Sequence, residues 1–132
     1  LIHVAAGWNI YDSAYADGLS NPDTDHSAPG SYPNLVEAIQ NGDITLVTLL
    51  VQDNGSSYPS TEYLADWSAE HTSGTSPVLG DRALSGSANM NQLLIRFAYP
   101  TFVLLDSDMS FLSLSTNESS FEALGTAEAL FE

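Results

Sequence analysis

The chain has 132 residues, the size of one compact domain, so we expect a single domain over residues 1–132. Seventeen acidic residues stand against two arginines, and the formal net charge of −15 at pH 7 excludes the basic footprint that nucleic-acid binding requires. The complete absence of cysteine excludes disulfides, thiolate metal sites and cysteine nucleophiles.

The first third of the chain predicts a strand followed by two helices. Residues 1–6 are almost entirely apolar and indicate a short buried strand. Residues 9–19 indicate a helix capped by Asn9, with apolar positions at Ile10, Ala14 and Leu19. After a loop rich in Pro, Gly and Ser at residues 20–33, a helical pattern resumes over residues 34–41.

The middle of the chain contains the clearest strand pattern. Residues 44–51 (ITLVTLLV) form a continuous β-branched run, which predicts a central strand covered on both faces. A turn-like QDNGSS follows, and Ser60 then caps a predicted helix over residues 61–71. Residues 77–79 indicate a brief extended piece, whereas residues 92–97 are apolar without a clear type.

The last third predicts a hairpin and a terminal helix. Strands are expected at residues 101–105 and 110–114, joined by a turn at 106–109. Residues 117–132 carry a rough helical stripe, with Thr116 or Asn117 as a possible cap. A strand–helix–strand unit followed by a hairpin and a helix predicts an α/β fold with a mixed central sheet. No apolar run reaches the ~20 residues of a membrane-spanning helix, so we expect no membrane insertion by this domain.

Three segments in this order resemble the thioredoxin-like proteins of the redoxin, or thiol–disulfide oxidoreductase, branch. The segment HVAAGW–NIYD resembles the strand and turn that end in GWC-x-x-C, with Asn9 and Asp12 at the two cysteine positions. The second segment runs from ITLVTLLV through a helix with a conspicuous Trp to SPVLGD. The third, YPTFVLLDSDM, resembles the family's hairpin, in which a cis proline faces the active cysteines.

The resemblance implies a thioredoxin-like three-layer fold, with helices on both faces of the mixed sheet. The hairpin that usually precedes the first strand is not seen, so the N-terminal part of the family's fold is expected to be missing. The resemblance also implies that the Tyr99–Pro100 bond is cis and faces Asn9 across one end of the sheet.

Neither residue at the redox positions can perform thiol chemistry. Asn9 cannot ionise and suits an N-cap, while Asp12 lies in the first helical turn, where the helix dipole favours a carboxylate. His3 lies within the first strand and is expected to be a satisfied core histidine, and no G-x-S-x-G elbow is present. We therefore expect no enzyme activity. An enzyme with repurposed chemistry at this turn, using Asp12, is the alternative.

An aromatic set around the same turn favours protein binding. The candidate contact residues are Trp8, Tyr11, Tyr99, Pro100 and Thr101, because the surface beside the cis proline docks extended polypeptide in thioredoxin-like proteins. Packing of the rings over the neighbouring loop is the competing interpretation. The predicted function is thus a redox-inactive module that binds a protein partner or self-assembles within a larger assembly.

The remaining expectations concern cofactors and cellular location. We expect no cofactor. Asp23 and Asp25 are weak candidates for Ca²⁺, since oxygen-rich loops bind it, but their spacing lacks the glycine and the distal glutamate of an EF-hand. A Ca²⁺-stabilised acidic structural protein is therefore a further alternative. The lack of cysteine and the low charged fraction of 14% suggest a periplasmic, cell-surface or secreted protein.

Overall fold

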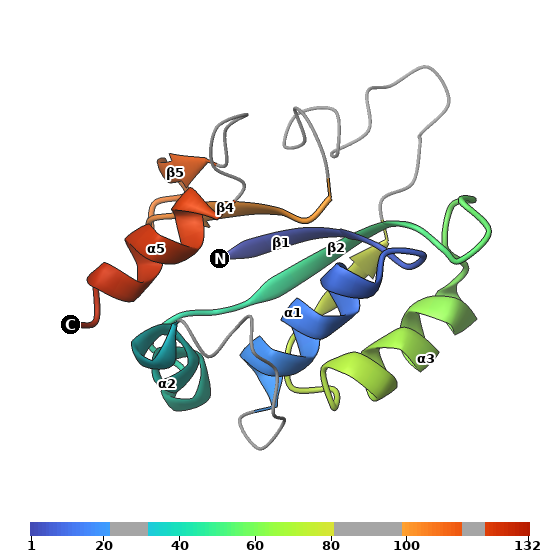
Figure 1. Cartoon of the computed structure of the whole chain (residues 1–132), viewed down its shortest axis with the longest axis horizontal. Coiled ribbons are helices and arrows are strands. Elements are labelled where there is room, and N and C mark those ends of the chain that lie inside the picture. Colours follow the sequence, from blue (N-terminus) through green and yellow to red (C-terminus); the bar gives the residue numbers. More distant parts are fainter. Residues whose placement is uncertain (22–31, 81–98, 115–120) are drawn as a thin grey trace.

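The computed structural model describes residues 1–21, 32–80, 99–114 and 121–132. These residues form an α/β fold in which four helices accompany one five-stranded mixed sheet (Figure 1). The elements are β1 (Ile2–Ala6), α1 (Ile10–Ser20), α2 (Pro33–Asn41), β2 (Val47–Gln52), α3 (Thr61–His71), β3 (Val78–Gly80), β4 (Thr101–Leu105), β5 (Phe111–Leu114) and α5 (Glu122–Ala129).

The sheet has the order β3-β2-β1-β4-β5, so the first strand lies at its centre. β1 pairs in parallel with β2, and β2 with β3, whereas β4 runs antiparallel to both β1 and β5. The register places His3 opposite Thr48 on one side and opposite Phe102 on the other. This arrangement confirms the predicted mixed sheet, made of a strand–helix–strand unit and a hairpin.

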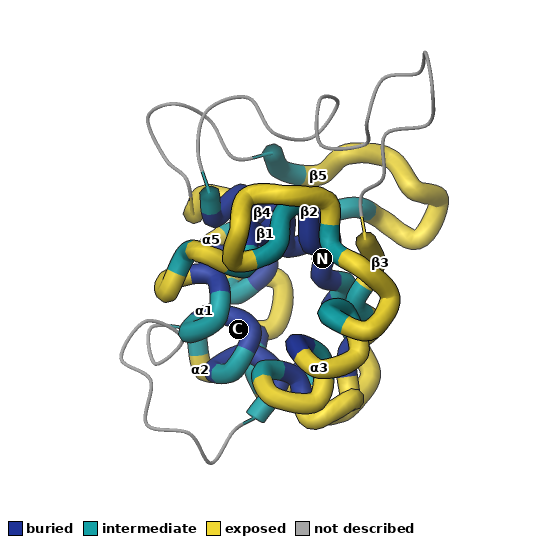
Figure 2. Tube along the Cα trace, turned by 90° about the vertical axis from the view of Figure 1, so that its right-hand side faces the viewer, coloured by how far each residue is buried: buried dark blue, intermediate teal, exposed yellow. Residues whose placement is uncertain are grey.

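Both faces of the sheet are buried at its central strands, as predicted for β2 from the continuous apolar run at residues 44–51. On one face Ala5 and Leu50 pack with Ala16 of α1 and Trp67 of α3. On the opposite face four fully or almost fully buried residues form a second cluster: Val4, Leu49, Val51 and Val103. The described helices lie on the first of these faces (Figure 2). The expected second helical layer is not among the described elements.

Helix boundaries follow the capping residues closely. Asn9 and Ser60 accept backbone N–H groups at the starts of α1 and α3, and Gly42 closes α2 with a left-handed φ of 79°. β2 begins later than the predicted strand, because Ile44 still donates its backbone N–H to the carbonyl of Ala38 in α2. Hydrogen bonding at the end of α2 therefore moves the start of β2 from the predicted residue 44 to Val47.

The C-terminal helix is shorter than predicted. It begins at Glu122, preceded by Phe121, which forms no side-chain cap. The predicted capping residues Thr116 and Asn117 lie outside the described residues. The buried face of α5 consists of Ala123, Leu124 and Ala127, which join the main core cluster beside β4.

A carboxylate from α5 completes the start of α2. Tyr32 provides no side-chain cap there. Instead, Glu128 Oε1 accepts the backbone N–H of Asn34 at 3.1 Å, and Glu128 Oε2 accepts that of Leu35 at 2.7 Å. The Asn34 side-chain amide adds a third contact to Oε1 at 2.8 Å. A distant acidic residue thus supplies the acceptors and the negative charge that a helix N-terminus favours.

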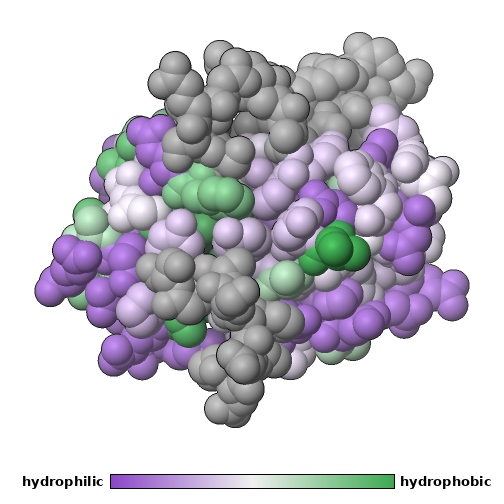
Figure 3. Space-filling model, viewed as in Figure 1, coloured by the Kyte–Doolittle hydropathy of each residue, from purple (hydrophilic) through white to green (hydrophobic). Residues whose placement is uncertain are grey.

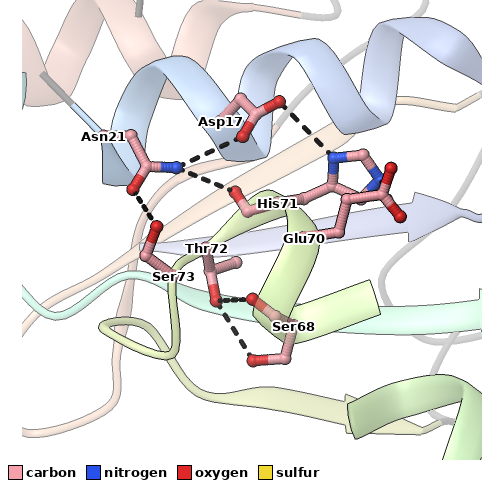
Figure 4. Close-up of polar contacts among 7 residues, drawn as sticks. All are labelled: Asp17, Asn21, Ser68, Glu70, His71, Thr72 and Ser73. Atoms are coloured by element: carbon pink, nitrogen blue, oxygen red, sulfur yellow. Dashed lines mark hydrogen bonds and ion pairs between the residues drawn. The ribbon is translucent and has the colours of Figure 1, made fainter. Parts of the chain in front are cut away.

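A polar network joins the ends of α1 and α3 (Figure 4). His71 Nδ1 lies 3.4 Å from Asp17 Oδ2, and Asn21 Nδ2 donates to Asp17 Oδ1 at 3.2 Å. Ser73 in turn donates to Asn21 Oδ1 at 2.6 Å. His71 ends α3, as predicted, where a cationic imidazole would meet the helix dipole favourably.

The surface seen in Figure 3 is mostly hydrophilic, and its apolar area is divided into separate patches. None of the described helices combines the length and the apolar character that crossing a bilayer requires.

Candidate functional site

The turn between β1 and α1 passes very close to the end of β2. The Gly7 backbone N–H donates to the carbonyl of Gln52 at 2.7 Å. A Cβ atom added at Gly7 would clash with the hydroxyl of Tyr63 and crowd that same carbonyl. Glycine therefore allows this close approach without displacement of the Tyr63 side chain or the Gln52 carbonyl.

Asn9 joins the start of α1 to the bend before β4. Its Oδ1 accepts the backbone N–H of Tyr11 at 3.0 Å, which makes it the N-cap that the sequence predicts. Its Nδ2 donates to the carbonyl oxygen of Tyr99 at 3.2 Å. The Tyr99–Pro100 peptide bond is cis. Both the cis bond and its proximity to Asn9 confirm the geometry expected from the sequence.

Asp12 has a different role from the one that its sequence position suggests. Its side chain is fully buried, and its Oδ1 lies 3.2 Å from His3 Nε2, which is also fully buried. Its Oδ2 accepts the backbone N–H of Ala6 at 2.9 Å. Asp12 thus links the start of α1 to β1 instead of simply resting in the helix dipole, and it offers no surface to a substrate in solvent.

His3 occupies the core, as predicted, but within the described residues only its Nε2 has a hydrogen-bond partner. The imidazole stacks on Phe102 with ring centroids 4.7 Å apart. Nδ1 has no hydrogen-bond partner within the described part of the chain, and neither has Thr48 Oγ1, the hydroxyl of its neighbour in register on β2. The sequence signal for this site is one titratable residue inside an otherwise apolar strand, which does not identify Asp12 as its partner.

The candidate protein-binding residues divide by exposure. Trp8 is 47% exposed and Tyr11 is 65% exposed, whereas Pro100 and Thr101 are buried. Ile10, one of the apolar positions of the predicted helix, is 76% exposed. Ile10 lies about 200° around the helix from the buried Asp12 of the same first turn, so it faces solvent. We refer to Trp8, Ile10, Tyr11 and Tyr99 as the aromatic corner.

Trp8 is held in place although it is exposed. Its indole Nε1 donates to Gln52 Oε1 at 2.7 Å, and its ring meets that of Tyr99 edge to face, with centroids 5.9 Å apart. The carbonyl of Tyr99 is already bonded to Asn9, and Thr101 pairs with Val4 in the sheet. The corner therefore offers side-chain surface, while the backbone around the cis proline is engaged within the protein.

The acidic turns show ordinary turn chemistry where they are described. Asp106 Oδ1 accepts the backbone N–H of Ser107, and Asp108 Oδ1 that of Ser110 at 2.9 Å. Hydrogen bonds from Ser110 lower the pKa of the Asp108 carboxyl. Within the described ranges, no group of three or more His, Asp or Glu side chains is arranged to hold a metal ion. Asp23 and Asp25 lie outside those ranges.

Comparison of the chain with protein-family models, curated proteins and solved structures finds no match.

Proposed function

We propose that the chain is a redox-inactive thioredoxin-like module that binds another protein, or a second copy of itself, as a structural subunit of an extracytoplasmic assembly. The observation that carries the proposal is the junction at Asn9. This residue stands at the first redox position of the resemblance and bonds to the carbonyl that precedes a cis proline. Exposed aromatic surface adjoins the junction.

The topology supports the thioredoxin-like, three-layer part of the proposal. A strand–helix–strand unit around central β1, followed by an antiparallel hairpin and a terminal helix, is the arrangement that the resemblance implies. The burial of Val4, Leu49 and Val103 on the face away from the described helices also supports it, because a third layer would cover that face.

The aromatic corner supports the binding part. Trp and Tyr dominate the energetics of protein interfaces, and large exposed apolar side chains that lie together mark interaction sites. Because its hydrogen bond and the Tyr99 ring already hold Trp8, little side-chain freedom remains to be lost on binding. The engaged backbone at Tyr99 and Thr101 favours docking of side chains over addition of a strand.

The extracytoplasmic location rests on composition. The chain has no cysteine, and charged residues make up only 14% of it, with Ser, Thr, Asn and Gly supplying most of the polarity. Such a composition is more typical of exported proteins than of cytosolic ones.

The test compares assemblies isolated with three forms of the chain: wild type, the triple variant Trp8→Ser, Ile10→Ser and Tyr11→Ser, and the control Leu130→Ser. Leu130 is exposed on the C-terminal end of α5, away from the corner. Loss of a hot-spot side chain costs roughly 2 kcal/mol or more, about thirtyfold in affinity, so the triple variant should leave its assembly while the control stays. If the same partner is isolated with the triple variant, the aromatic corner is not part of the interface.

The alternatives make different predictions. An enzyme that acts at this turn would lose turnover in Asn9→Ala, whereas a binding module would retain its partner if the corner keeps its shape. The burial of Asp12 and its bonds to His3 and Ala6 count against its direct participation in a reaction. A Ca²⁺-stabilised protein would show a melting temperature that falls when a chelator is added.

A further inference from the structure

We propose that Asn54 is a self-modifying site, at which the fold promotes conversion of the Asn54–Gly55 pair to aspartate and isoaspartate. The pair occupies the middle of the tight turn between β2 and α3. The turn is closed by the backbone N–H of Ser56, which donates to the carbonyl of Asp53 at 3.2 Å. Asn54 and Gly55 are both exposed, so water has access to the turn.

The nucleophile of this reaction is held by a carboxylate. The backbone N–H of Gly55 donates to Asp53 Oδ1 at 2.8 Å. A general base acts at this range, and proton removal is what turns an amide nitrogen into a nucleophile. Glycine also lacks the Cβ that would shield its nitrogen from the preceding side chain.

The electrophile is held by a hydrogen-bond donor. The Tyr63 hydroxyl donates to Asn54 Oδ1 at 2.8 Å, which polarises the side-chain amide and stabilises charge that develops on this oxygen. A phenol is protonated at neutral pH, and burial, with a contribution from the Asp53 charge, raises the pKa of Tyr63 further. Asp53 and Tyr63 thus each contact one of the two reacting groups.

The reaction balances with water as its only co-reactant. Gly55 N gives its proton to the Asp53 carboxylate and bonds to Asn54 Cγ, while the carbonyl electrons move onto Oδ1 beside Tyr63. Collapse of this intermediate breaks the Cγ–Nδ2 bond, and the nitrogen leaves as ammonia with the proton that Asp53 received. The five-membered succinimide is then opened by water at either carbonyl, giving aspartate or isoaspartate and one additional negative charge.

The sequence holds a built-in control, because Asn41 and Gly42 form a second Asn–Gly pair. There Asn41 ends α2, and the Gly42 N–H donates to helical carbonyls, those of Ala38 and Ile39. These acceptors are main-chain oxygens, not carboxylates, and the pair is held in helical and left-handed conformations. Folding is expected to slow the reaction at Asn41 and to accelerate it at Asn54.

The experiment incubates the folded chain in heavy-oxygen water and follows both pairs by peptide mapping. Asn54 should incorporate oxygen and form isoaspartate faster than Asn41, and unfolding in urea should abolish the difference. General acid–base assistance of the usual size predicts that Asp53→Asn and Tyr63→Phe each slow Asn54 by about tenfold or more, with Asn41 unchanged. Circular dichroism establishes that each variant is folded.

Three results would overturn the proposal: equal rates at Asn54 and Asn41 in the folded chain, faster conversion of Asn54 in urea, or acceleration by either variant. The last would mean that the contacts of Asp53 and Tyr63 restrain the turn and protect Asn54. A readout in the intact protein is also available. Gln52 accepts a hydrogen bond from Trp8 and donates one to the carbonyl of Ser56 at 3.5 Å. Because isoaspartate lengthens the main chain of the turn, its formation should change the fluorescence emission of Trp8.

Discussion

Two histidine–aspartate contacts of similar length occur in very different surroundings. His3 Nε2 and Asp12 Oδ1 are 3.2 Å apart, and both side chains are fully buried. His71 Nδ1 and Asp17 Oδ2 are 3.4 Å apart, with side chains 17% and 21% exposed. One pair fixes the start of α1 against β1, and the other joins the far end of α1 to α3.

Their energetics differ because water is displaced from one pair and remains near the other. When one partner of a buried pair is removed, the other side chain stays buried with neither partner nor water, which lowers the free energy of unfolding by several kcal/mol. A contact near the surface contributes little to that free energy. The buried pair therefore controls whether the turn below the aromatic corner keeps its shape. The outer pair, His71–Asp17, makes a smaller contribution, to the packing of α3 against α1.

The largest expected effect comes from Asp12→Ala, which should lower the free energy of unfolding by about 3–5 kcal/mol. The variant strands His3 in the core and leaves the Ala6 N–H without its acceptor. Urea unfolding measures the loss. The double variant His3→Leu with Asp12→Leu is the control, and it should be more stable than Asp12→Ala, since it buries no unpaired polar side chain. A double variant less stable than Asp12→Ala would contradict this account.

An intermediate effect is expected at Glu128, whose carboxylate is partly buried. Glu128→Ala removes three acceptor contacts at the start of α2 and should cost about 1–2 kcal/mol, the range for loss of a helix cap. Hydrogen exchange should rise first in α2. Glu132→Ala, at an exposed position on the same C-terminal segment, is the matched control and should change the free energy of unfolding little.

The outer pair should give a smaller effect. Asp17→Asn is expected to cost less than about 1 kcal/mol, because the part-exposed pair is screened by solvent and Asn21 and Ser73 keep the helix ends joined. The difference between wild type and variant should shrink as salt is added. A loss equal to that of Asp12→Ala would show that burial does not separate the two pairs.

The sequence predicted this architecture where local rules decide it. Asn9, Ser60 and Gly42 mark helix ends through their own hydrogen bonds or backbone freedom, so these boundaries could be placed in advance. The approach of Asn9 to Tyr99 could also be predicted, because the resemblance links the first turn to the cis proline.

What escaped prediction depends on tertiary packing. Asp12 and its partner His3 are nine residues apart, and their contact requires the strand to fold back beneath the helix start. The exposure of Ile10 likewise depends on packing, because the first turn of α1 directs Asp12 into the core and Ile10, on the other side of the helix, toward solvent. Two further contacts have no local motif, because Glu128 reaches the start of α2 from α5 and Tyr63 reaches Asn54 from α3.

The smallest expected effect is a change in how stability depends on pH, through Tyr15, which lies in the same core as the buried pair. Tyr15 packs on Phe102, which stacks on His3, and burial, followed by the nearby Tyr32, raises the pKa of the Tyr15 phenol. A folded-state pKa above the unfolded value leaves stability unchanged below about pH 10 and lowers it as pH rises through the folded pKa. Tyr15→Phe should therefore lose less stability between neutral and alkaline pH than wild type does. Tyr11→Phe, which changes a largely exposed ring, should follow wild type; identical alkaline losses for both variants would mean that Tyr15 ionises without opening the core.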